Sequence, residues 1–119
     1  MKNLSLIVLV AIAMVSAIAY ADSLTKPING SYYIAGRTVL DPAPNEAQDT
    51  HFRVYLTGTS ARSLYQTMKV RAKPDVCLDD GSVSKQVGEM VCTRHKKGQF
   101  TCAFAIDVMR QRIHHAQVC

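Results

Sequence analysis

The segment QFTCAFAIDV, residues 99–108, has the clearest periodic pattern in the chain. Its larger apolar side chains occupy every second position: Phe100, Cys102, Phe104, Ile106 and Val108. The alternate positions hold Gln99, Thr101, Ala103, Ala105 and Asp107. This is the period of a β-strand with one buried face. We therefore expect the core to lie on the side of Phe104, within a C-terminal third that is rich in extended segments.

Three of the four cysteines lie in this C-terminal part, and the fourth, Cys77, opens it. An even number of cysteines in an exported protein predicts two disulfides and no free thiol. Cys102 shares the apolar face, and Cys119 is in phase with Ile113 on the strand expected to pair with it. We therefore favour Cys102 with Cys119 and Cys77 with Cys92. The alternative joins Cys92 to Cys102 across the hairpin between their strands.

The N-terminus predicts export. Lys2 is followed by an apolar run, Leu4–Ile18, and then by the small-x-small sequence Ala19-Tyr20-Ala21. This order is typical of a secretory signal peptide, and the run is shorter than the roughly 20 residues of a membrane-spanning helix. We expect cleavage of residues 1–21, no transmembrane segment afterwards, and a periplasmic or secreted domain over residues 22–119. The style of the signal indicates a bacterial envelope.

Between the signal and the cysteine-rich part, the pattern predicts two strands, a loop and a helix. In the second strand Phe52, Val54 and Leu56 alternate with polar residues, which predicts one buried and one solvated face. The helix follows a cap at Thr59 or Ser60, and its apolar stripe is formed by Ala61, Leu64, Tyr65 and Met68. The strands are expected at residues 31–40, 51–57, 84–93, 99–108 and 112–119, and a long loop at Asp41–Thr50.

These elements predict the fold class. We expect an α+β domain with a small, mostly antiparallel sheet of about five strands, one short helix packed on one face, and two disulfides. A domain of this size buries only about two thirds of its surface, so the disulfides contribute a large share of its stability.

The sequence carries no recognisable catalytic or metal-binding motif. No serine lies in a nucleophile elbow, and Asp79-Asp80-Gly81 lacks the further ligands of a calcium loop. The adjacent pair His114-His115 would point to opposite faces of a strand. The four histidines do not have the i, i+4 spacing of a helical zinc site, and no Cys-x-x-Cys pair supports a thioredoxin-like redox role. We expect no metal, no cofactor and no catalytic residue. The histidines are His51, His95, His114 and His115.

Two surfaces are candidates for binding a partner. The first is a basic hairpin tip that the next turn could extend by two arginines, and it would dock an acidic surface. Its residues are Arg94, His95, Lys96, Lys97, Arg110 and Arg112. The second is the Asp41–Thr50 loop, which could enter a partner's cleft. An ordinary solvated hairpin tip and a plain connecting loop are the simpler interpretations.

The leading functional hypothesis is a non-enzymatic protein-binding domain of the bacterial envelope, with an inhibitor or immunity role as its most specific form. The basic residues are dispersed and the compartment is exported, which disfavours nucleic acid as a partner. The alternative is an accessory envelope protein that binds polysaccharide or lipid head groups, and a third hypothesis is a small hydrolase. Lysozyme inhibitors and secretion-system immunity proteins are similar in size, export and paired cysteines, but no diagnostic motif of either is present.

Overall fold

The computed structural model describes residues 24–119, so the predicted signal peptide, residues 1–21, lies outside the described part. The described chain forms a sheet-rich domain with one complete helix and two disulfides. The sheet has seven strands, two more than expected. The two-residue strand β3 was not predicted, and the single strand predicted at residues 84–93 is a hairpin of two strands, β4 and β5. The elements are β1 (Gly30–Ala35), β2 (His51–Thr57), α2 (Gly58–Thr67), β3 (Lys73–Pro74), β4 (Val83–Val87), β5 (Met90–Arg94), β6 (Phe100–Asp107) and β7 (Arg112–His114).

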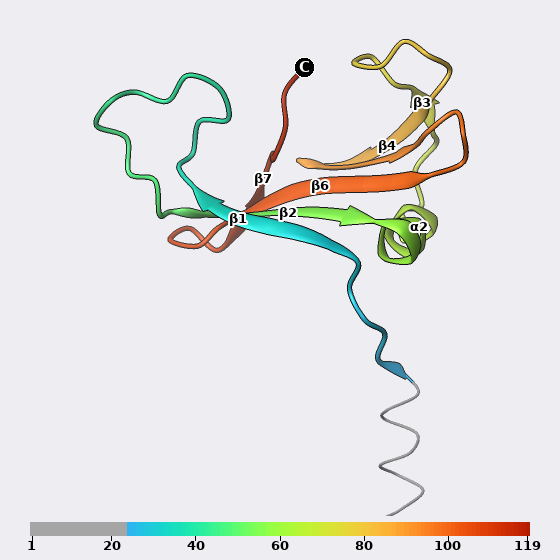
Figure 1. The fold of residues 1–119 in the computed structure, drawn as a ribbon, viewed down its shortest axis with the longest axis horizontal. Helices are drawn as coiled ribbons and strands as arrows, with labels where there is room; N and C mark the ends of the chain where they lie inside the picture. The colour runs from blue at the N-terminus through green and yellow to red at the C-terminus, as the bar shows by residue number, and fades with distance from the viewer. Residues whose placement is uncertain (1–23) are drawn as a thin grey trace, which may run out of the picture.

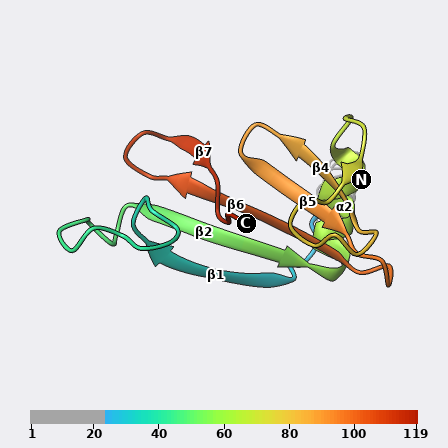
Figure 2. The same ribbon diagram turned by 90° about the horizontal axis from the view of Figure 1, so that it is seen from above.

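All neighbouring strands are antiparallel, in the order β1-β2-β6-β5-β4-β3, and β7 also pairs with β6. The predicted strand at residues 99–108 is therefore the centre of the sheet. One edge of β6 pairs with β2 over residues 101–107. Its other edge is divided, since β5 pairs with residues 100–103 and β7 with residues 105–107 (Figure 2).

Helix α2 lies against one end of one sheet face (Figure 1). Its buried residues Ala61 and Tyr65 pack with Met68 against the Cys92–Cys102 disulfide, so the predicted apolar stripe is confirmed. The predicted cap is wrong, because Thr57 is the N-cap and the helix starts at Gly58. Ser60 instead fastens the segment before β1, since its Oγ accepts a 2.7 Å hydrogen bond from the backbone N–H of Asn29.

The C-terminal segment, residues 115–119, covers the opposite face of the sheet. Ala116 packs against Ala103 and Ala105, and its carbonyl accepts a 2.7 Å hydrogen bond from the hydroxyl of Tyr55. This cover contradicts the predicted solvated face of β2. His51 and Arg53 are each only 1% exposed, whereas Phe52, Val54 and Leu56 on the expected buried face are half-buried.

The disulfides also differ from the favoured pairing. Cys92 bonds to Cys102, directly opposite it in the β5–β6 ladder, and Cys77 bonds to Cys119. The prediction failed because it placed Cys119 in a strand beside Cys102. Strand β7 ends at His114, and the chain then leaves the sheet on the side opposite α2 and reaches the turn that carries Cys77 (Figure 1). The alternative across the hairpin is the one the structure shows.

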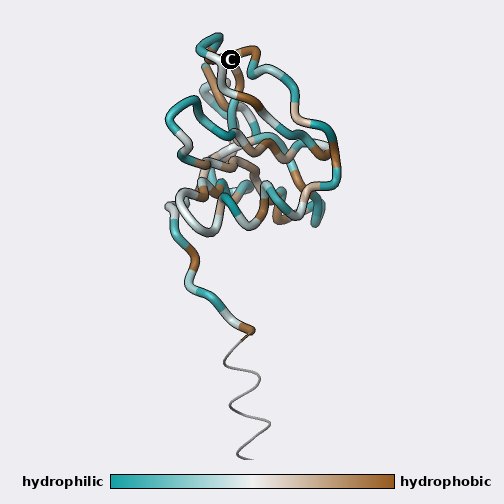
Figure 3. Tube along the Cα trace, turned by 90° about the vertical axis from the view of Figure 1, so that its right-hand side faces the viewer, coloured by the Kyte–Doolittle hydropathy of each residue, from teal (hydrophilic) through white to brown (hydrophobic). Residues whose placement is uncertain are grey.

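The first predicted strand also ends early, at Ala35 rather than residue 40. The following loop is fastened internally, because the Glu46 carboxylate accepts hydrogen bonds from the backbone N–H and the hydroxyl of Thr38. The short segment before β1 extends away from the body of the domain (Figure 3). It carries two exposed apolar residues, Leu24 and Ile28.

Candidate functional site

An apolar area on the α2 side of the sheet remains uncovered. Strand register places its residues in two rows across neighbouring strands, since directly paired residues share a face. One row joins Tyr32, Val54 and Phe104, and the next joins Ile34, Phe52, Ile106 and Ile113. We call these seven residues the open apolar face.

The open apolar face continues the same side of the sheet that α2 covers. Leu56 and Cys102 form the adjacent row beneath the helix. The helix has only ten residues and does not extend over the remaining rows. Tyr32, Ile34, Ile106 and Ile113 are consequently 67%, 51%, 37% and 40% exposed. The Tyr32 and Phe52 rings stack with centroids 4.7 Å apart, so the surface is packed as well as exposed.

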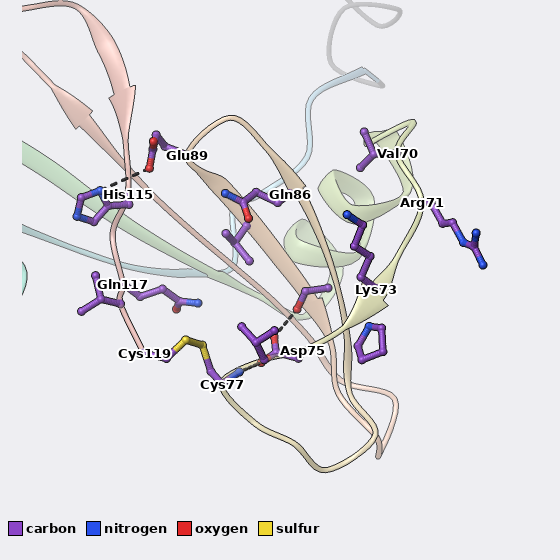
Figure 4. A pocket seen from close by; sticks show the side chains of 15 residues that line it. Val70, Arg71, Lys73, Asp75, Cys77, Gln86, Glu89, His115, Gln117 and Cys119 are labelled. Atoms are coloured by element: carbon purple, nitrogen blue, oxygen red, sulfur yellow. Dashed lines mark hydrogen bonds and ion pairs between the residues drawn. A yellow bond between two sulfur atoms is a disulfide. The ribbon is translucent and has the colours of Figure 1, made fainter.

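A groove of about 720 Å³ lies between the C-terminal segment and strands β3 and β4 (Figure 4). The Cys77–Cys119 disulfide bounds it on one side, and a 3.5 Å ion pair between His115 and Glu89 bounds it on another. The groove thus forms where the two disulfide-linked parts of the chain meet.

One of the two acidic residues that line this groove, Asp75, organises a turn. Its carboxylate accepts hydrogen bonds from the backbone N–H groups of Cys77 and Leu78 and from the hydroxyls of Ser84 and Thr93. Burial acts to raise the pKa of Asp75, but these hydrogen bonds outweigh it and hold the pKa below its ordinary value. A carboxylate with its lone pairs so engaged is poorly suited to act as a general base.

A second polar cluster lies inside the domain, at the start of β2. His51 Nδ1 is 2.9 Å from Thr50 Oγ1, and His51 Nε2 is 3.8 Å from the Asp107 carboxylate without a hydrogen-bond partner. Burial lowers the pKa of His51 and outweighs the opposite effect of Asp107. Both side chains are 1% exposed, so substrate has no access to them. The cluster is a structural element of the core.

The structure separates the predicted basic surface into two parts. Arg94–Lys97 lies at the β5–β6 hairpin, where Arg94 pairs with Phe100. Arg110 and Arg112 lie beyond the opposite end of β6, a span of about 24 Å at ~3.4 Å per residue. Both arginines contact the Asp107 carboxylate, Arg110 at 3.2 Å and Arg112 at 3.9 Å. The six residues therefore form two separate basic groups at opposite ends of β6.

The hairpin tip itself is an ordered turn. The backbone N–H of His95 bonds to the carbonyl of Gln99, and that of Gly98 to the carbonyl of His95. His95 is half-buried and its Nε2 lies 2.8 Å from Thr101 Oγ1, whereas Arg94, Lys96 and Lys97 are exposed.

His114 and His115 do not point to opposite faces of a strand as predicted. Their ring centroids are 4.1 Å apart, because β7 ends at His114 and the backbone turns there. Within residues 24–119, no group of three or more His, Cys, Asp or Glu side chains is placed to hold a metal ion.

Comparison with known proteins gives no relative: no family model, curated protein or solved structure matches this chain. No helix in the described part of the chain is long and apolar enough to span a membrane.

The sequence did not predict the open apolar face, because four of its residues were expected in the core: Phe52, Val54, Phe104 and Ile106. The alternation in β2 and β6 shows correctly that they share one face of the sheet. A signal for its exposure was the length of the predicted helix, which is too short to cover strands of seven and eight residues.

Proposed function

We propose that this protein is an exported, non-enzymatic protein-binding domain, and that it binds an amphipathic helix of a partner protein on the open apolar face. The observation that carries the proposal is the exposure of Tyr32, Ile34, Ile106 and Ile113 on one packed, contiguous surface. Contiguous apolar patches are unusual on monomeric soluble proteins and mark interaction sites.

The dimensions of the open apolar face favour a helix as the occupant. Its two rows lie about 7 Å apart along the strands, and they extend across three and four strands at about 4.8 Å spacing. A helix about 10 Å wide and three turns long would cover both rows. It would lie beside α2 in the same layer, so the partner would complete the helical cover that the ten residues of α2 begin. Helices with an apolar stripe bind to grooves in this way.

The chemistry of the face also separates this proposal from charge-driven docking. None of the seven residues is charged. Binding should therefore depend weakly on salt, whereas docking through Lys96 and Lys97 would weaken as salt screens the charges. Charge reversal, Lys96→Glu with Lys97→Glu, tests docking through the basic hairpin tip directly.

A photo-crosslinking side chain at Ile106 tests the proposal. The oxidised exported protein would be incubated with an extract of its own compartment, and the crosslinked peptide would be identified by mass spectrometry. We expect a peptide with apolar residues at helical spacing. The matched control carries the crosslinker at Val76, which is exposed but lies outside the open apolar face. Equal crosslinking at both positions would contradict the proposal.

Ile106→Asp combined with Ile113→Asp should weaken binding of the captured partner at least tenfold, about 1.4 kcal/mol. Val76→Asp should leave it unchanged. Retention of glycans or lipid vesicles in place of a protein would favour the envelope-ligand alternative. Assay of the partner with and without this domain would then test the inhibitor or immunity form of the proposal.

A further inference from the structure

Strand β1 is an unprotected edge of the sheet. The two edge strands of the main path are β1 and β3. β3 consists only of Lys73 and Pro74, and a short strand with lysine and proline is a common protection against edge pairing. β1 has six residues, GSYYIA, with no charge and no proline. This contrast indicates that pairing at β1 is tolerated or used.

The backbone pattern shows which residues of β1 face outward. The carbonyl of Asn29 accepts from the N–H of Thr57, and the carbonyl of Ala35 accepts from the N–H of Thr50. In an antiparallel strand, the backbone N–H and carbonyl groups of every second residue point toward the same neighbouring strand. Since the carbonyls of Asn29 and Ala35 point toward β2, the backbone groups of the odd-numbered residues of β1 bond to β2. The N–H and carbonyl groups of Gly30, Tyr32 and Ile34 therefore point away from the sheet. β1 pairs with no strand other than β2 in the described part of the chain.

We infer that the partner of this edge is a second copy of the chain, paired antiparallel to β1 around a two-fold axis at Tyr32. In this register Tyr32 lies opposite Tyr32 of the second copy, and Gly30 lies opposite its Ile34. The three outward residues of each copy then exchange six backbone hydrogen bonds. Such an isologous interface uses the same patch on both subunits.

The side chains of β1 complement themselves in this register. Gly30 has no side chain, which leaves room on the apolar side for Ile34 of the second copy. The two Tyr32 rings form a cross-strand aromatic pair, which stabilises antiparallel strands. On the other face Tyr33, already stacked on Tyr55 at 6.1 Å, meets Ser31 of the second copy. Because β1 is uncharged, no like charges face each other across the seam.

The pairing also joins the two open apolar faces. A two-fold axis perpendicular to the sheet keeps both copies on the same side, so Tyr32 and Ile34 of one copy lie beside those of the other. The seam leaves Phe104, Ile106 and Ile113 free, because they belong to β6 and β7. The dimer goes beyond the proposed function and does not depend on it.

Sedimentation equilibrium of the isolated, oxidised protein tests the inference, with Tyr32→Pro as the variant. Proline at residue 32 removes an N–H that points away from β2, so the β1–β2 hydrogen bonds remain. We expect a dimer in the wild type and at least tenfold weaker association in Tyr32→Pro. A wild type that stays monomeric at about 100 μM (a free energy of only some 5 kcal/mol) overturns the inference.

A cysteine scan determines the register and remains informative if Tyr32→Pro fails to fold. Tyr32→Cys places two thiols opposite each other across the axis, at a Cα separation near 5.5 Å that a disulfide spans. We expect an intermolecular disulfide for Tyr32→Cys and none for the neighbouring control Ser31→Cys. Equal crosslinking of both variants, or a dimer that Tyr32→Cys does not trap, overturns the β1 seam and points to packing of the faces or to an extended partner peptide.

Discussion

At the scale of single residues, the most consequential side chain is the buried guanidinium of Arg53. Its nitrogens donate to the carbonyls of Gly36 at 2.7 Å, Arg37 at 3.0 Å and His115 at 3.2 Å. These acceptors lie 16 to 62 residues away in the chain. Arg53 therefore joins the loop after β1, the sheet and the C-terminal segment at one point.

Arg53→Met should destabilise the domain by about 3 kcal/mol, because it removes three charge-assisted hydrogen bonds and leaves carbonyl groups without their donor. Urea denaturation measures the change. Arg71→Met is the matched control, since Arg71 is exposed and its replacement should change stability by about 0.5 kcal/mol or less. Similar losses in both variants would contradict the role assigned to Arg53.

Two histidines, the buried His51 and the half-buried His114, predict a pH dependence. Burial lowers the pKa of both His51 and His114 below the ordinary value of 6.5. Asp107 acts to raise that of His51, while Arg53, Arg110 and His114 act to lower it. The unfolded chain therefore binds protons before the folded one does. Stability should be complete above about pH 6.5 and decrease as the pH falls below it.

Denaturation midpoints at pH 7.5 and 5.5 measure this effect. The double variant His51→Gln, His114→Gln should be less stable at pH 7.5 but should lose less of its stability between the two pH values than the wild type does. An unchanged difference between the two pH values would assign the pH dependence to other groups.

At the scale of elements, β6 supports two different layers. Cys102 faces α2, and Ala103 and Ala105 face the C-terminal segment. The alternation of large and small residues in this strand reflects two covers at different distances. A helix packs on side chains of ordinary size, whereas the extended C-terminal segment approaches closely enough that only alanine is accommodated.

Ala105→Leu should therefore destabilise the domain by about 2 kcal/mol through overpacking, because Ala105 is fully buried beneath Ala116. Ile106→Leu, one position along on the half-exposed side, should change stability by about 0.5 kcal/mol. Thermal or chemical denaturation of the two variants compares them. If Ala105→Leu is tolerated as well as Ile106→Leu, the close approach of the C-terminal segment is wrong.

At the scale of the whole molecule, the Cys77–Cys119 disulfide fixes the C-terminal layer. It closes a loop with a sequence separation of 42, compared with 10 for Cys92–Cys102. It also holds in place the segment whose carbonyls accept from Arg53 and Tyr55. Its loss would affect the side of the sheet that carries His51 and Asp107.

The chain-entropy relation predicts a loss of about 4 kcal/mol for Cys77→Ser with Cys119→Ser, and about 3 kcal/mol for Cys92→Ser with Cys102→Ser. Exposure of the C-terminal segment adds to the first loss. Guanidinium denaturation of both variants gives the order, and peptide mapping without reduction verifies the pairing. A larger loss for the Cys92–Cys102 variant would contradict the importance of the C-terminal layer.

The sequence alone determined the strand centred on Phe104, the bounds of β2, the apolar stripe of α2 and the presence of two disulfides, because each of these depends on local periodicity or on cysteine count. Which face of β2 is buried, how the cysteines pair and where the open apolar face lies were decided only by the tertiary structure. Periodicity shows that alternate residues share a face, but it does not show what covers that face. Here the cover is a C-terminal segment some 60 residues away, fixed by Arg53, Tyr55 and Cys77.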